Sequence, residues 1–407
     1  MAVPPIPSNK WLWPHFPWGL TGMMGRGDCR AMEPAYLDPR SGETFPLAVP
    51  RWCGTNQAPL LLTPLPGISR DAIDGTERSL WRYRAALPFE PDDVISLGEG
   101  CTPLLAREFH GARVLLKCEW MMPTGSFKDR GASVMLSLLR AQGIHAVLED
   151  SSGNGGAAIA AYAAAGGMAA TIMAPASTSP AKTVQMRAHG AAVELIPGSR
   201  QDTADAAVAR AEKIFYASHN WHPFFLQGTK TLAYELWEDL GFSAPDNVIV
   251  PCGAGSNVLG CEIGFAELFR SGEITRLPRI FAAQPRNCAP IAAAFLEDDE
   301  HARAEIKPTI AEGTAIAQPI RLHEVLGALR ETEGGAVMLS ETEIATAIFD
   351  LARIGIYVEP TAAQVAAAFA KLLASGAIST EQTTVLVLTG SGLKATIRIA
   401  ELLGVAL

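Results

Sequence analysis

Beyond residue 95, short apolar runs alternate along the chain with longer segments in which apolar residues recur at helical spacing. The short runs are rich in β-branched residues and predict strands at 114–117, 146–148, 169–173, 192–196, 248–250, 280–283 and 384–388. The longer segments predict helices at 132–139, 156–165, 180–188, 202–215, 229–240, 257–269, 341–353, 361–373 and 393–403. This alternation predicts an α/β fold in which mostly parallel sheets are covered by helices on both faces.

The first 95 residues lack this periodicity, apart from a helical patch at 80–88, and are rich in proline and tryptophan. Near its start the chain carries four aromatic residues set among prolines: Trp11, Trp13, Phe16 and Trp18. The segment lacks the basic start and the continuous apolar run of a secretory signal. We therefore expect residues 1–95 to form an extension whose aromatic arm packs on the domain surface or on a second subunit.

With 407 residues, of which 48% are hydrophobic and 18% charged, the chain is long enough for two domains with sizeable cores. Its net charge of −9 argues against a nucleic-acid partner, since there is no basic excess to neutralise phosphates. An anionic small molecule is not excluded, because it needs only local amides and a few donors. No run of about 18 uncharged apolar residues occurs, so we expect no membrane span.

The seven cysteines are scattered, odd in number and never spaced as C-x-x-C. They are Cys29, Cys53, Cys101, Cys118, Cys252, Cys261 and Cys288. This pattern favours reduced cysteines in a cytoplasmic protein over a zinc site or a disulfide framework.

A nine-residue stretch at 123–131 carries the most specific chemical signal, and it reads Pro-Thr-Gly-Ser-Phe-Lys-Asp-Arg-Gly. It places Lys128 in a loop of small and turn-forming residues, just ahead of the helix predicted at 132–139. The positive end of a helix dipole repels an ammonium group and favours the neutral amine. The neutral amine is the form that attacks a carbonyl. The alternative is an ordinary surface lysine before a helix.

Three further loops follow predicted strands, at the sheet edge where parallel α/β proteins bind ligands. The first loop consists of Ser151, Ser152, Gly153, Asn154 and Gly155. Its amides would point out of a helix N-terminus, where a carboxylate is stabilised, and Asn154 adds a side-chain donor. Taken alone, this loop also fits a plain strand-to-helix turn.

The second loop consists of Gly253, Ala254, Gly255, Ser256 and Asn257, between a predicted strand and a predicted helix. Glycines permit close backbone approach and successive amides form a concave anion site, so the loop suits a phosphate. A dinucleotide site looks similar, but no G-x-G-x-x-G follows the first strand of a βαβ unit.

The third loop begins at Thr389. The Thr389 hydroxyl contacts a ligand in one interpretation. In the other, Thr389 is a β-branched residue that only ends a strand.

The lysine stretch and the three loops together resemble the threonine synthases and their relatives, which are pyridoxal-phosphate enzymes of fold type II. The resemblance also covers Leu-Gly-Glu-Gly-Cys-Thr-Pro-Leu at 97–104 and the Glu359-Pro360 pair, and it extends over residues 80–403. It implies a homodimer with a fold like that of the tryptophan synthase β subunit, with pyridoxal phosphate between two αβα domains. The smaller, mobile domain would be 125–222, and the larger domain would combine 96–124 with 223–407.

The same resemblance implies a role for each candidate residue. Lys128 would hold the cofactor as a Schiff base and remove the substrate α-proton, with Phe127 beside it. Asn154 would bond the 3′ oxygen of the cofactor ring, Thr389 its pyridine nitrogen, and residues 253–257 its phosphate. The substrate would be bound by Ser151, Ser152, Gly153, Gly155 and Gln284. A threonine hydroxyl is too weak an acid to protonate the ring nitrogen, which suits elimination or replacement at the substrate side chain.

The chain departs from the threonine synthases where their second phosphate site lies. That site takes phosphohomoserine with a threonine, an asparagine-serine pair and an arginine, and the corresponding residues here are Gly155, His219, Asn220 and Phe225. Met122 likewise replaces an asparagine. A dianion needs charge-assisted donors, and phenylalanine supplies none.

We therefore expect a pyridoxal-phosphate-dependent lyase that removes the α-proton of a small amino acid and eliminates or replaces its β-substituent. The alternative is threonine synthase itself, with the phosphate held by His219, His222 or Arg286 instead. A third hypothesis is a protein that only binds a phosphorylated metabolite, but the presence of Lys128, Asn154 and Thr389 argues against it. We expect no metal ion in the site.

Overall fold

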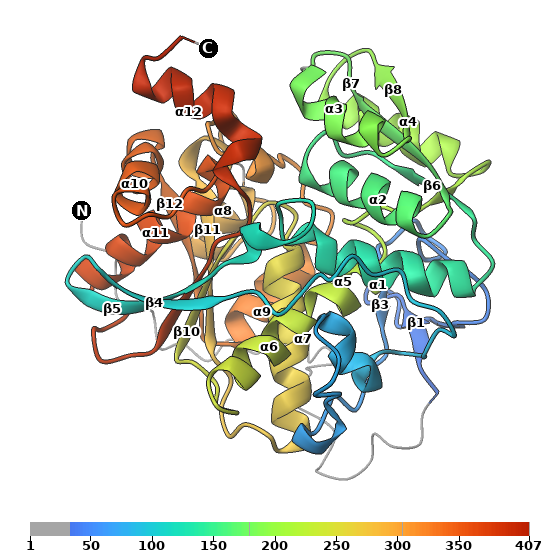
Figure 1. Ribbon diagram of the computed structural model, residues 1–407, viewed down its shortest axis with the longest axis horizontal. Coiled ribbons are helices and arrows are strands. Elements are labelled where there is room, and N and C mark those ends of the chain that lie inside the picture. Colours follow the sequence, from blue (N-terminus) through green and yellow to red (C-terminus); the bar gives the residue numbers. More distant parts are fainter. Residues whose placement is uncertain (1–32, 179, 303, 407) are drawn as a thin grey trace.

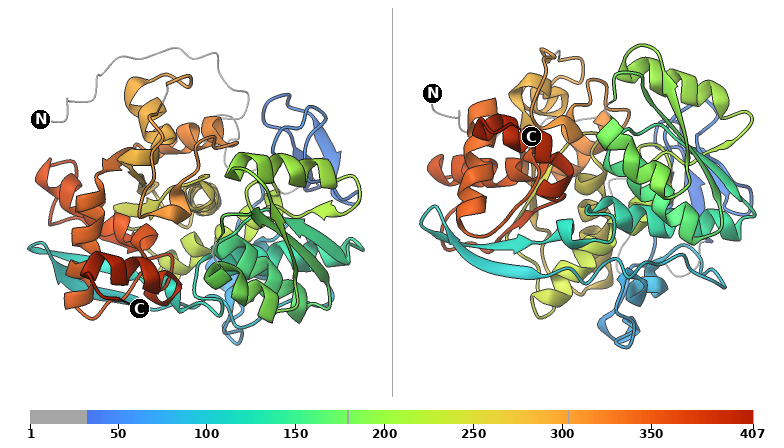
Figure 2. Two further views of the ribbon diagram at one scale, coloured as in Figure 1. Left: turned by 90° about the horizontal axis from the view of Figure 1, so that it is seen from above. Right: turned by 45° about the horizontal axis from the view of Figure 1, so that its top comes forward.

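The described part of the chain forms two lobes, each built around one mostly parallel sheet, and an N-terminal extension (Figure 1 and Figure 2). The computed structural model describes residues 33–178, 180–302 and 304–406. The predicted packing of the aromatic arm therefore lies outside the described residues, as does Cys29. Helices flank both sheets, so the predicted α/β fold is confirmed.

The larger sheet has six strands, in the order β12 (Gly335–Leu339), β11 (Arg279–Pro285), β10 (Asn247–Pro251), β13 (Thr384–Val387), β5 (Ala112–Lys117) and β4 (Leu104–Phe109). Neighbouring strands are parallel except for β4, which runs antiparallel to β5. Alternate residues of β10 enter different cores, with Val248 and Val250 on one face and Ile249 on the other. Burial on both faces explains why the central strands are continuously apolar.

Different helices cover the two faces of the larger sheet. One face packs against α6 (Thr231–Asp239), α7 (Ser256–Ser271), α8 (Pro290–Glu297) and α9 (Leu322–Glu331). The other face packs against α10 (Glu341–Arg353) and α11 (Pro360–Ala374), and α12 (Thr396–Leu403) follows near the end of the chain. Ser340 starts α10 sharply because its side chain accepts the Glu343 amide in a capping box.

The smaller sheet has four parallel strands, in the order β8 (Ala192–Ile196), β7 (Ala169–Pro175), β6 (Ala146–Glu149) and β9 (Phe215–Tyr216). One face packs against α1 (Lys128–Ala141), α2 (Asn154–Ala165) and α3 (Pro180–Ala188), and α4 (Arg200–Arg210) covers the other. The helices α1 and α5 (Pro223–Thr229) pack against each other between the two sheets (Figure 1).

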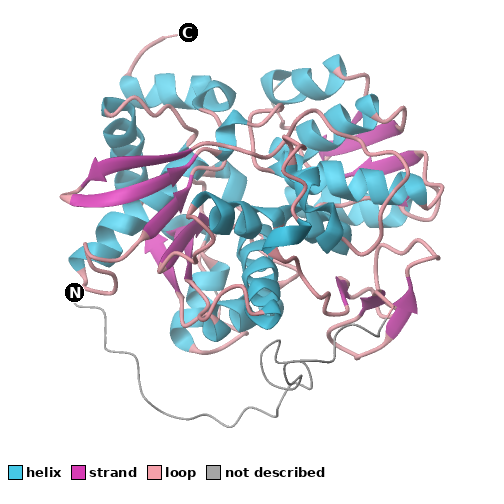
Figure 3. Ribbon diagram, turned by 60° about the horizontal axis from the view of Figure 1, so that its bottom comes forward, coloured by secondary structure: helices cyan, strands magenta, loops and turns pink. Residues whose placement is uncertain are grey.

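The N-terminal extension contains elements that the sequence did not predict. It forms an antiparallel sheet of β1 (Ala35–Leu37), β2 (Thr44–Pro46) and β3 (Leu61–Leu62), which Figure 3 shows apart from the two larger sheets. Two 3-10 helices follow, η1 (Arg70–Ala72) and η2 (Leu80–Ala86), of which η2 lies where the helical patch at 80–88 was predicted. The ring of Tyr36 stacks on Phe224 with centroids 5.5 Å apart, and Trp81 Nε1 donates to Ser133 Oγ at 2.9 Å. The extension is therefore packed onto α5 and α1.

All the predicted strands are present, with small shifts at their ends. The helix predicted at 202–215 is wrong at its end, because α4 stops at Arg210 and Phe215 and Tyr216 pair with β6 instead. The sequence did not predict β4, β9, β12, α5, α8 or α9. Four short 3-10 helices complete the fold: η3 (Glu119–Met121), η4 (Arg286–Cys288), η5 (Glu312–Thr314) and η6 (Gly392–Ala395). Within the described residues, no helix has the length and apolar character needed to cross a membrane.

Candidate active site

Lys128 is the first residue of α1 and therefore lies at the positive end of that helix, where the sequence placed it. The loop before it turns at Gly125, which has a φ of 84°. The side chain and the backbone amide of Thr124 both donate to the carboxylate of Asp129, the amide at 2.7 Å. These bonds hold the loop against the first turn of α1 and fix the origin of the lysine side chain.

The amino group of Lys128 lies beside two aromatic rings. Its Nζ is 4.8 Å from the ring centroid of Phe127 and 5.4 Å from that of Phe225. Burial lowers the pKa of Lys128 from 10.5 to about 8, while the nearby Glu149 carboxylate acts in the opposite direction. The sequence argument relied on the helix dipole, whereas burial has the largest effect in the structure. Much more of this amine is neutral near pH 7 than for an exposed lysine.

Asn154 begins α2, directly after the loop that follows β6. Its Nδ2 donates to Oε1 of Glu359 at 3.0 Å, although the two residues are 205 positions apart. Glu359 is almost completely buried, and burial raises its pKa. In the rest of this loop, Ser151 and Ser152 are part-buried, Gly153 is exposed and Gly155 is buried. Since Glu359 also acts on the pKa of Lys128, the loop at 151–155 and the reactive amine share one site.

The glycine loop at 253–257 joins β10 to α7 with very little space around it. Gly255 has a φ of 96°, and a Cβ added there would lie 2.2 Å from Cγ2 of Val325. A Cβ added at Gly253 would lie 3.1 Å from Cα of Thr314. The loop ends where Ser256 begins α7, so its backbone lies at the positive end of a 16-residue helix. This geometry suits a phosphate group.

Two of the predicted cofactor residues have enclosed polar atoms without a hydrogen-bond partner among the described residues. They are Oδ1 and Nδ2 of Asn257 and Oγ1 of Thr389. Buried polar atoms are rarely left unpaired in proteins. Asn257 and Thr389 follow β10 and β13, which pair in parallel and so end at the same edge of the sheet. A ligand with a phosphate and a ring nitrogen would pair these atoms, so the residues present fit pyridoxal phosphate.

Gln284 has contacts that differ from the predicted one. On β11, its Nε2 donates to the carbonyl of Cys252 at 2.9 Å, and its Oε1 accepts the amide of Ala292 at 2.9 Å. Both ends of the side chain are thus used within the protein, to tie β11 to the start of the glycine loop and to α8. The predicted contact between Gln284 and substrate stays a prediction.

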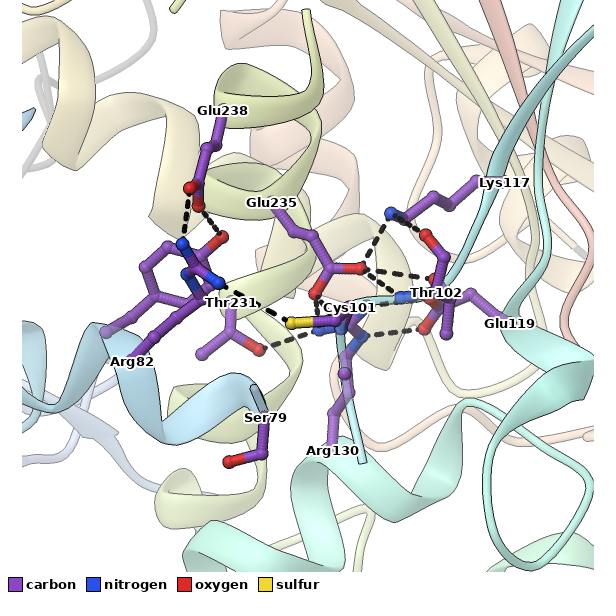
Figure 4. A network of polar contacts seen from close by, with 12 residues as sticks. Ser79, Arg82, Cys101, Thr102, Lys117, Glu119, Arg130, Thr231, Glu235 and Glu238 are labelled. Atoms are coloured by element: carbon purple, nitrogen blue, oxygen red, sulfur yellow. Dashed lines mark hydrogen bonds and ion pairs between the residues drawn. The ribbon is translucent and has the colours of Figure 1, made fainter. Parts of the chain in front are cut away.

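Arg130, two residues after Lys128, anchors α1 in a buried ionic network (Figure 4). Its guanidinium pairs with Glu119 at 2.7 Å and with Glu235 at 2.9 Å, and Lys117 pairs with Glu235 at 2.6 Å. The network therefore joins α1 to η3, β5 and α6. The predicted domain boundary falls just before α1, yet these ion pairs bond α1 to elements assigned to the larger domain. The division into domains stays a prediction.

The sequence analysis did not foresee a buried acid–base pair near Lys128. Glu149 ends β6 and is fully buried; its Oε1 lies 2.7 Å from Nδ1 of His219, and its Oε2 accepts the His219 amide at 3.0 Å. The two residues meet because Tyr216, three positions before His219, pairs with Leu148 on the adjacent strand. The sequence signal for this pair was a glutamate at the end of a predicted buried strand. Its partner could not be predicted, because it depends on how β9 aligns with β6.

Two residues at positions where the sequence analysis expected the second phosphate site of the threonine synthases to be replaced, Gly155 and Phe225, lie against this pair. The ring of Phe225, fully buried, lies 5.7 Å from the ring of His219. A Cβ added at Gly155 would lie 2.8 Å from Nδ1 of His219. The glycine at 155 therefore makes room for the imidazole, and the apolar ring of Phe225 lies close to both the imidazole and Lys128.

The two other suggested phosphate donors are placed differently. His222 is enclosed by the rings of Tyr36 and Phe224, and burial lowers its pKa to about 3, so it carries no charge at neutral pH. Arg286 is exposed, in η4 just after β11. Met122 is buried, and its sulfur accepts the Gly100 amide at 3.2 Å. None of these three offers a buried positive charge.

A buried lysine at a helix start, a glycine loop at the start of a second helix and unpaired polar atoms on Asn257 and Thr389 fit a pyridoxal-phosphate enzyme of fold type II. The sequence profile described as "Pyridoxal-phosphate dependent enzyme" matches residues 95–390. The chain belongs to this family and, within it, to the threonine synthase-like enzymes, which makes it a pyridoxal-phosphate-dependent lyase.

Three comparisons illustrate the relationship. Threonine synthase from Methanocaldococcus jannaschii is 34% identical over 337 residues, which cover 80% of this chain and 83% of that protein. Threonine synthase from Methanosarcina acetivorans is 34% identical over 326 residues, which cover 78% of this chain and 80% of that protein. The solved structure of a fungal L-serine ammonia-lyase from Rhizomucor miehei superposes with a TM-score of 0.65 and 20% identity, covering 77% of this chain and 99% of that one. The structural likeness concerns the fold alone.

Proposed function

We propose that this enzyme eliminates the β-substituent of a small amino acid whose leaving group carries no phosphate, with β-replacement as the related outcome when a nucleophile is present. The observation that carries the proposal is the Phe225 ring, 5.4 Å from Nζ of Lys128, at the position where the threonine synthase pattern has an arginine. An apolar ring beside the reactive amine favours a small neutral side chain over a phosphate dianion.

The local charges support the same conclusion. Glu149 is close enough to Lys128 to act on its pKa, and burial raises the pKa of Glu149 itself to about 7, so this residue supplies no positive charge for a phosphate. Arg200 is the cation that acts on both Lys128 and His219. Its guanidinium, however, donates to the carboxylate of Asp150 at 2.7 Å and to the Asp150 carbonyl at 2.6 Å. The positive charge of Arg200 is thus already balanced within the protein.

In this proposal Lys128, beside Phe127, would hold the cofactor covalently. The backbone at 253–257 would hold its phosphate with the side chains of Ser256 and Asn257, and Thr389 would contact its ring nitrogen. Asn154, whose Nδ2 donates one N–H to Glu359, would contact the 3′ oxygen with its second N–H. Bound pyridoxal phosphate withdraws electrons from the substrate α-carbon. Lys128, as a neutral amine, accepts the α-proton, and the amides of the loop at 151–155 orient the substrate carboxylate at the positive end of α2.

A second candidate function is threonine synthase, which converts O-phosphohomoserine to threonine. Its support is the 34% identity to proteins of that name over 80% and 78% of this chain. In that case the substrate phosphate needs a positively charged donor. The part-exposed Arg200 could serve only if its guanidinium left the Asp150 carboxylate.

One competition experiment separates the two functions. The purified, cofactor-loaded enzyme is offered serine, threonine, 2,3-diaminopropionate, O-acetylserine and O-phosphohomoserine, and keto acid, ammonia, phosphate and threonine are measured. Each lost charge-assisted contact is worth about 1.5–3 kcal/mol, so kcat/KM for the best non-phosphorylated substrate should exceed that for phosphohomoserine by at least about a hundredfold. Efficient formation of threonine from phosphohomoserine would establish the second function instead.

We further propose that the enzyme acts in the cytoplasm as a homodimer. The six cysteines of the described residues are all free, which is typical of a reducing compartment. Large apolar side chains are exposed on η3, η6 and α12, where a second copy would cover them: Met121, Leu393 and Ile397. Size-exclusion chromatography with light scattering tests the dimer.

A further inference from the structure

The imidazole of His219 is held from one side only. Its Nδ1 lies 2.7 Å from the Glu149 carboxylate, and the His219 amide bonds the second carboxylate oxygen, so the histidine is fixed at two points. Its other ring nitrogen, Nε2, has no hydrogen bond among the described residues. His219 remains 8% exposed, whereas Glu149 is completely buried. In this pair, Glu149 is therefore enclosed by protein, whereas Nε2 of the imidazole is free to bond a ligand.

The imidazole of His219 faces the candidate active site. The imidazole lies against Gly155 of the substrate-carboxylate loop and against Phe225, whose ring is also next to Nζ of Lys128. The charged groups that act on the pair are Lys128 on α1 and the Asp150–Arg200 ion pair, in which Tyr216 also donates to Asp150 at 2.9 Å. A substrate whose α-carbon is near Lys128 and whose carboxylate is at 151–155 would have its side chain beside His219.

We propose that His219, oriented by Glu149, donates a proton to the departing β-substituent of the substrate. The inference rests on the proposed elimination, because only a leaving group that departs as a base needs this proton. The arrangement is that of a general acid oriented by a buried carboxylate.

The proton transfers balance over one turnover. Lys128 takes the α-proton, and the electron pair of that bond ends in the new Cα–Cβ double bond as the β-substituent leaves with its own bonding pair. The Nε2–H bond of the neutral imidazole breaks and its proton forms an O–H or N–H bond on the leaving group, while Nδ1 takes up the proton that Glu149 held, which leaves a neutral imidazole beside a carboxylate. The imidazole regains a proton, and Lys128 loses one, by exchange with water when the product has left.

The electrostatics of the pair agree with this role. Burial raises the pKa of Glu149 to about 7 and lowers the pKa of His219 well below its ordinary value. Burial therefore disfavours a lone carboxylate and a lone imidazolium alike, and it favours the state in which the two groups share one proton with no net charge. Near neutral pH, that state can give one proton to a leaving group.

The alternative is that His219 only fills the space left by the glycine at 155. Two substrates distinguish these roles, namely serine, whose hydroxyl must be protonated to leave, and β-chloroalanine, whose chloride leaves without a proton. In His219→Gln and Glu149→Gln, kcat for serine should fall by about a hundredfold or more, as for loss of a general acid. With β-chloroalanine, kcat should fall less than about fivefold if only the acid is lost. Equal losses with both substrates would show a structural role and overturn the inference.

Two controls accompany these variants. His189→Gln makes the same chemical change at an exposed histidine after α3 and should leave both reactions unchanged. Exchange of the serine α-proton with deuterium from solvent should persist in His219→Gln, because Lys128 is intact. A wild-type enzyme that turns over neither these two substrates nor the other non-phosphorylated amino acids offered above would refute the proposed function itself, which is a different outcome from a variant that loses both.

A further measurement needs neither turnover nor bound cofactor. In the cofactor-free protein with 15N-labelled histidine, NMR follows the protonation of each imidazole against pH. The His219 signal should change in the pH range where Glu149 titrates, and this step should disappear in Glu149→Gln. A His219 titration identical in the two proteins would overturn the pairing. If the variants do not fold, the wild-type rate for β-substituents of increasing basicity decides: a shallow dependence supports an internal acid and a steep one contradicts it.

Discussion

The backbone amide of Phe127 donates to the carbonyl of Thr389 at 3.0 Å, which joins the lysine loop to the loop after β13. The Ser391 amide donates back to the carbonyl of Gly125, also at 3.0 Å, so the two loops pair like short antiparallel strands. Because these bonds are between main-chain atoms, they set the position of the reactive lysine relative to the Thr389 hydroxyl whatever the surrounding side chains are.

Replacing the lysine should separate catalysis from folding. Lys128→Ala removes both the point of covalent attachment and the α-proton acceptor, so turnover should fall by several orders of magnitude, while circular dichroism and the unfolding midpoint stay near those of the wild type. The visible absorbance band of the bound cofactor, which borohydride should trap in the wild type, should be absent. A variant that keeps more than about a tenth of the wild-type rate would contradict the assignment.

The attachment of cofactor to the apo-enzyme should depend on pH in a defined direction. The pKa of Lys128 is lowered to about 8, so the fraction of neutral amine, and with it the attachment rate, should rise with pH and level off above about 8. Stopped-flow absorbance after mixing apo-enzyme with pyridoxal phosphate measures this rate. A rate that continues to rise up to the ordinary lysine pKa of 10.5 would show that the amine is not perturbed.

The two glycines at the ends of α7 provide a matched pair. Gly255 and Gly272 both have positive φ, 96° and 82°, but an added Cβ meets Val325 at 2.2 Å only at Gly255, whereas nothing lies within 4 Å of it at Gly272. Gly255→Ala should therefore weaken cofactor binding by at least about tenfold, or about 1.4 kcal/mol. Gly272→Ala should cost about 1–2 kcal/mol of stability from backbone strain and leave cofactor affinity unchanged. Absorbance titration checks both; equal affinities in the two variants would place the phosphate elsewhere.

Breaking the buried network should destabilise the protein strongly. Arg130→Met leaves Glu119 and Glu235 buried, with Lys117 as the remaining cation, which should cost about 3–5 kcal/mol. The control is Arg276→Met, which removes an exposed ion pair with Asp246 and should cost less than about 1 kcal/mol. Urea denaturation of the cofactor-free proteins measures the difference, and similar midpoints would mean that the network contributes little.

Glu262 on α7 should make stability depend on pH. Its side chain is buried, its Oε1 has no partner among the described residues, and burial raises its pKa to about 8. The folded state keeps a proton that the unfolded chain releases near pH 4.5, so the unfolding free energy should fall as pH rises from 4.5 to 8, by up to about 1.4 kcal/mol per unit.

Glu262→Gln cannot release that proton, so its unfolding free energy should depend less steeply on pH between 4.5 and 8. The same substitution at the exposed Glu381 should keep the wild-type slope. Urea midpoints at pH 6 and pH 8 for the three proteins test this, and parallel slopes in all three would show that Glu262 is ionised in the fold.

Much of the fold follows from the sequence because its central strands are buried on both faces. Strands such as β10 and β13 are continuous apolar runs, and the helices that cover them have clear periodicity. β4 was missed because its middle residues are exposed, and β9 because two residues are too few to show a pattern. β9 also shows the limit of local reasoning, since it is a strand only through its pairing with β6.

The candidate site was predictable where the backbone makes it. Loops that follow buried strands and start helices can be recognised from glycines and from one lysine, and Gly255 has the positive φ that such a loop requires. Pairs between distant side chains could not be deduced in this way. The bonds between Asn154 and Glu359 and between Glu149 and His219 depend on how whole elements align.

The anchoring of Arg130 has an evolutionary consequence. The lysine helix is bonded to β5 and α6, whereas Glu149 and His219 come from the smaller sheet and the chain that follows it. In the proposed mechanism, substitutions at positions 149, 155 and 219 change substrate preference while the ionic anchoring of the lysine helix stays in place. A side chain at 155 requires a change at 219 as well, because its Cβ would lie 2.8 Å from Nδ1 of His219. Descendants of one ancestral enzyme can thus acquire different substrates by paired replacements at a few sites.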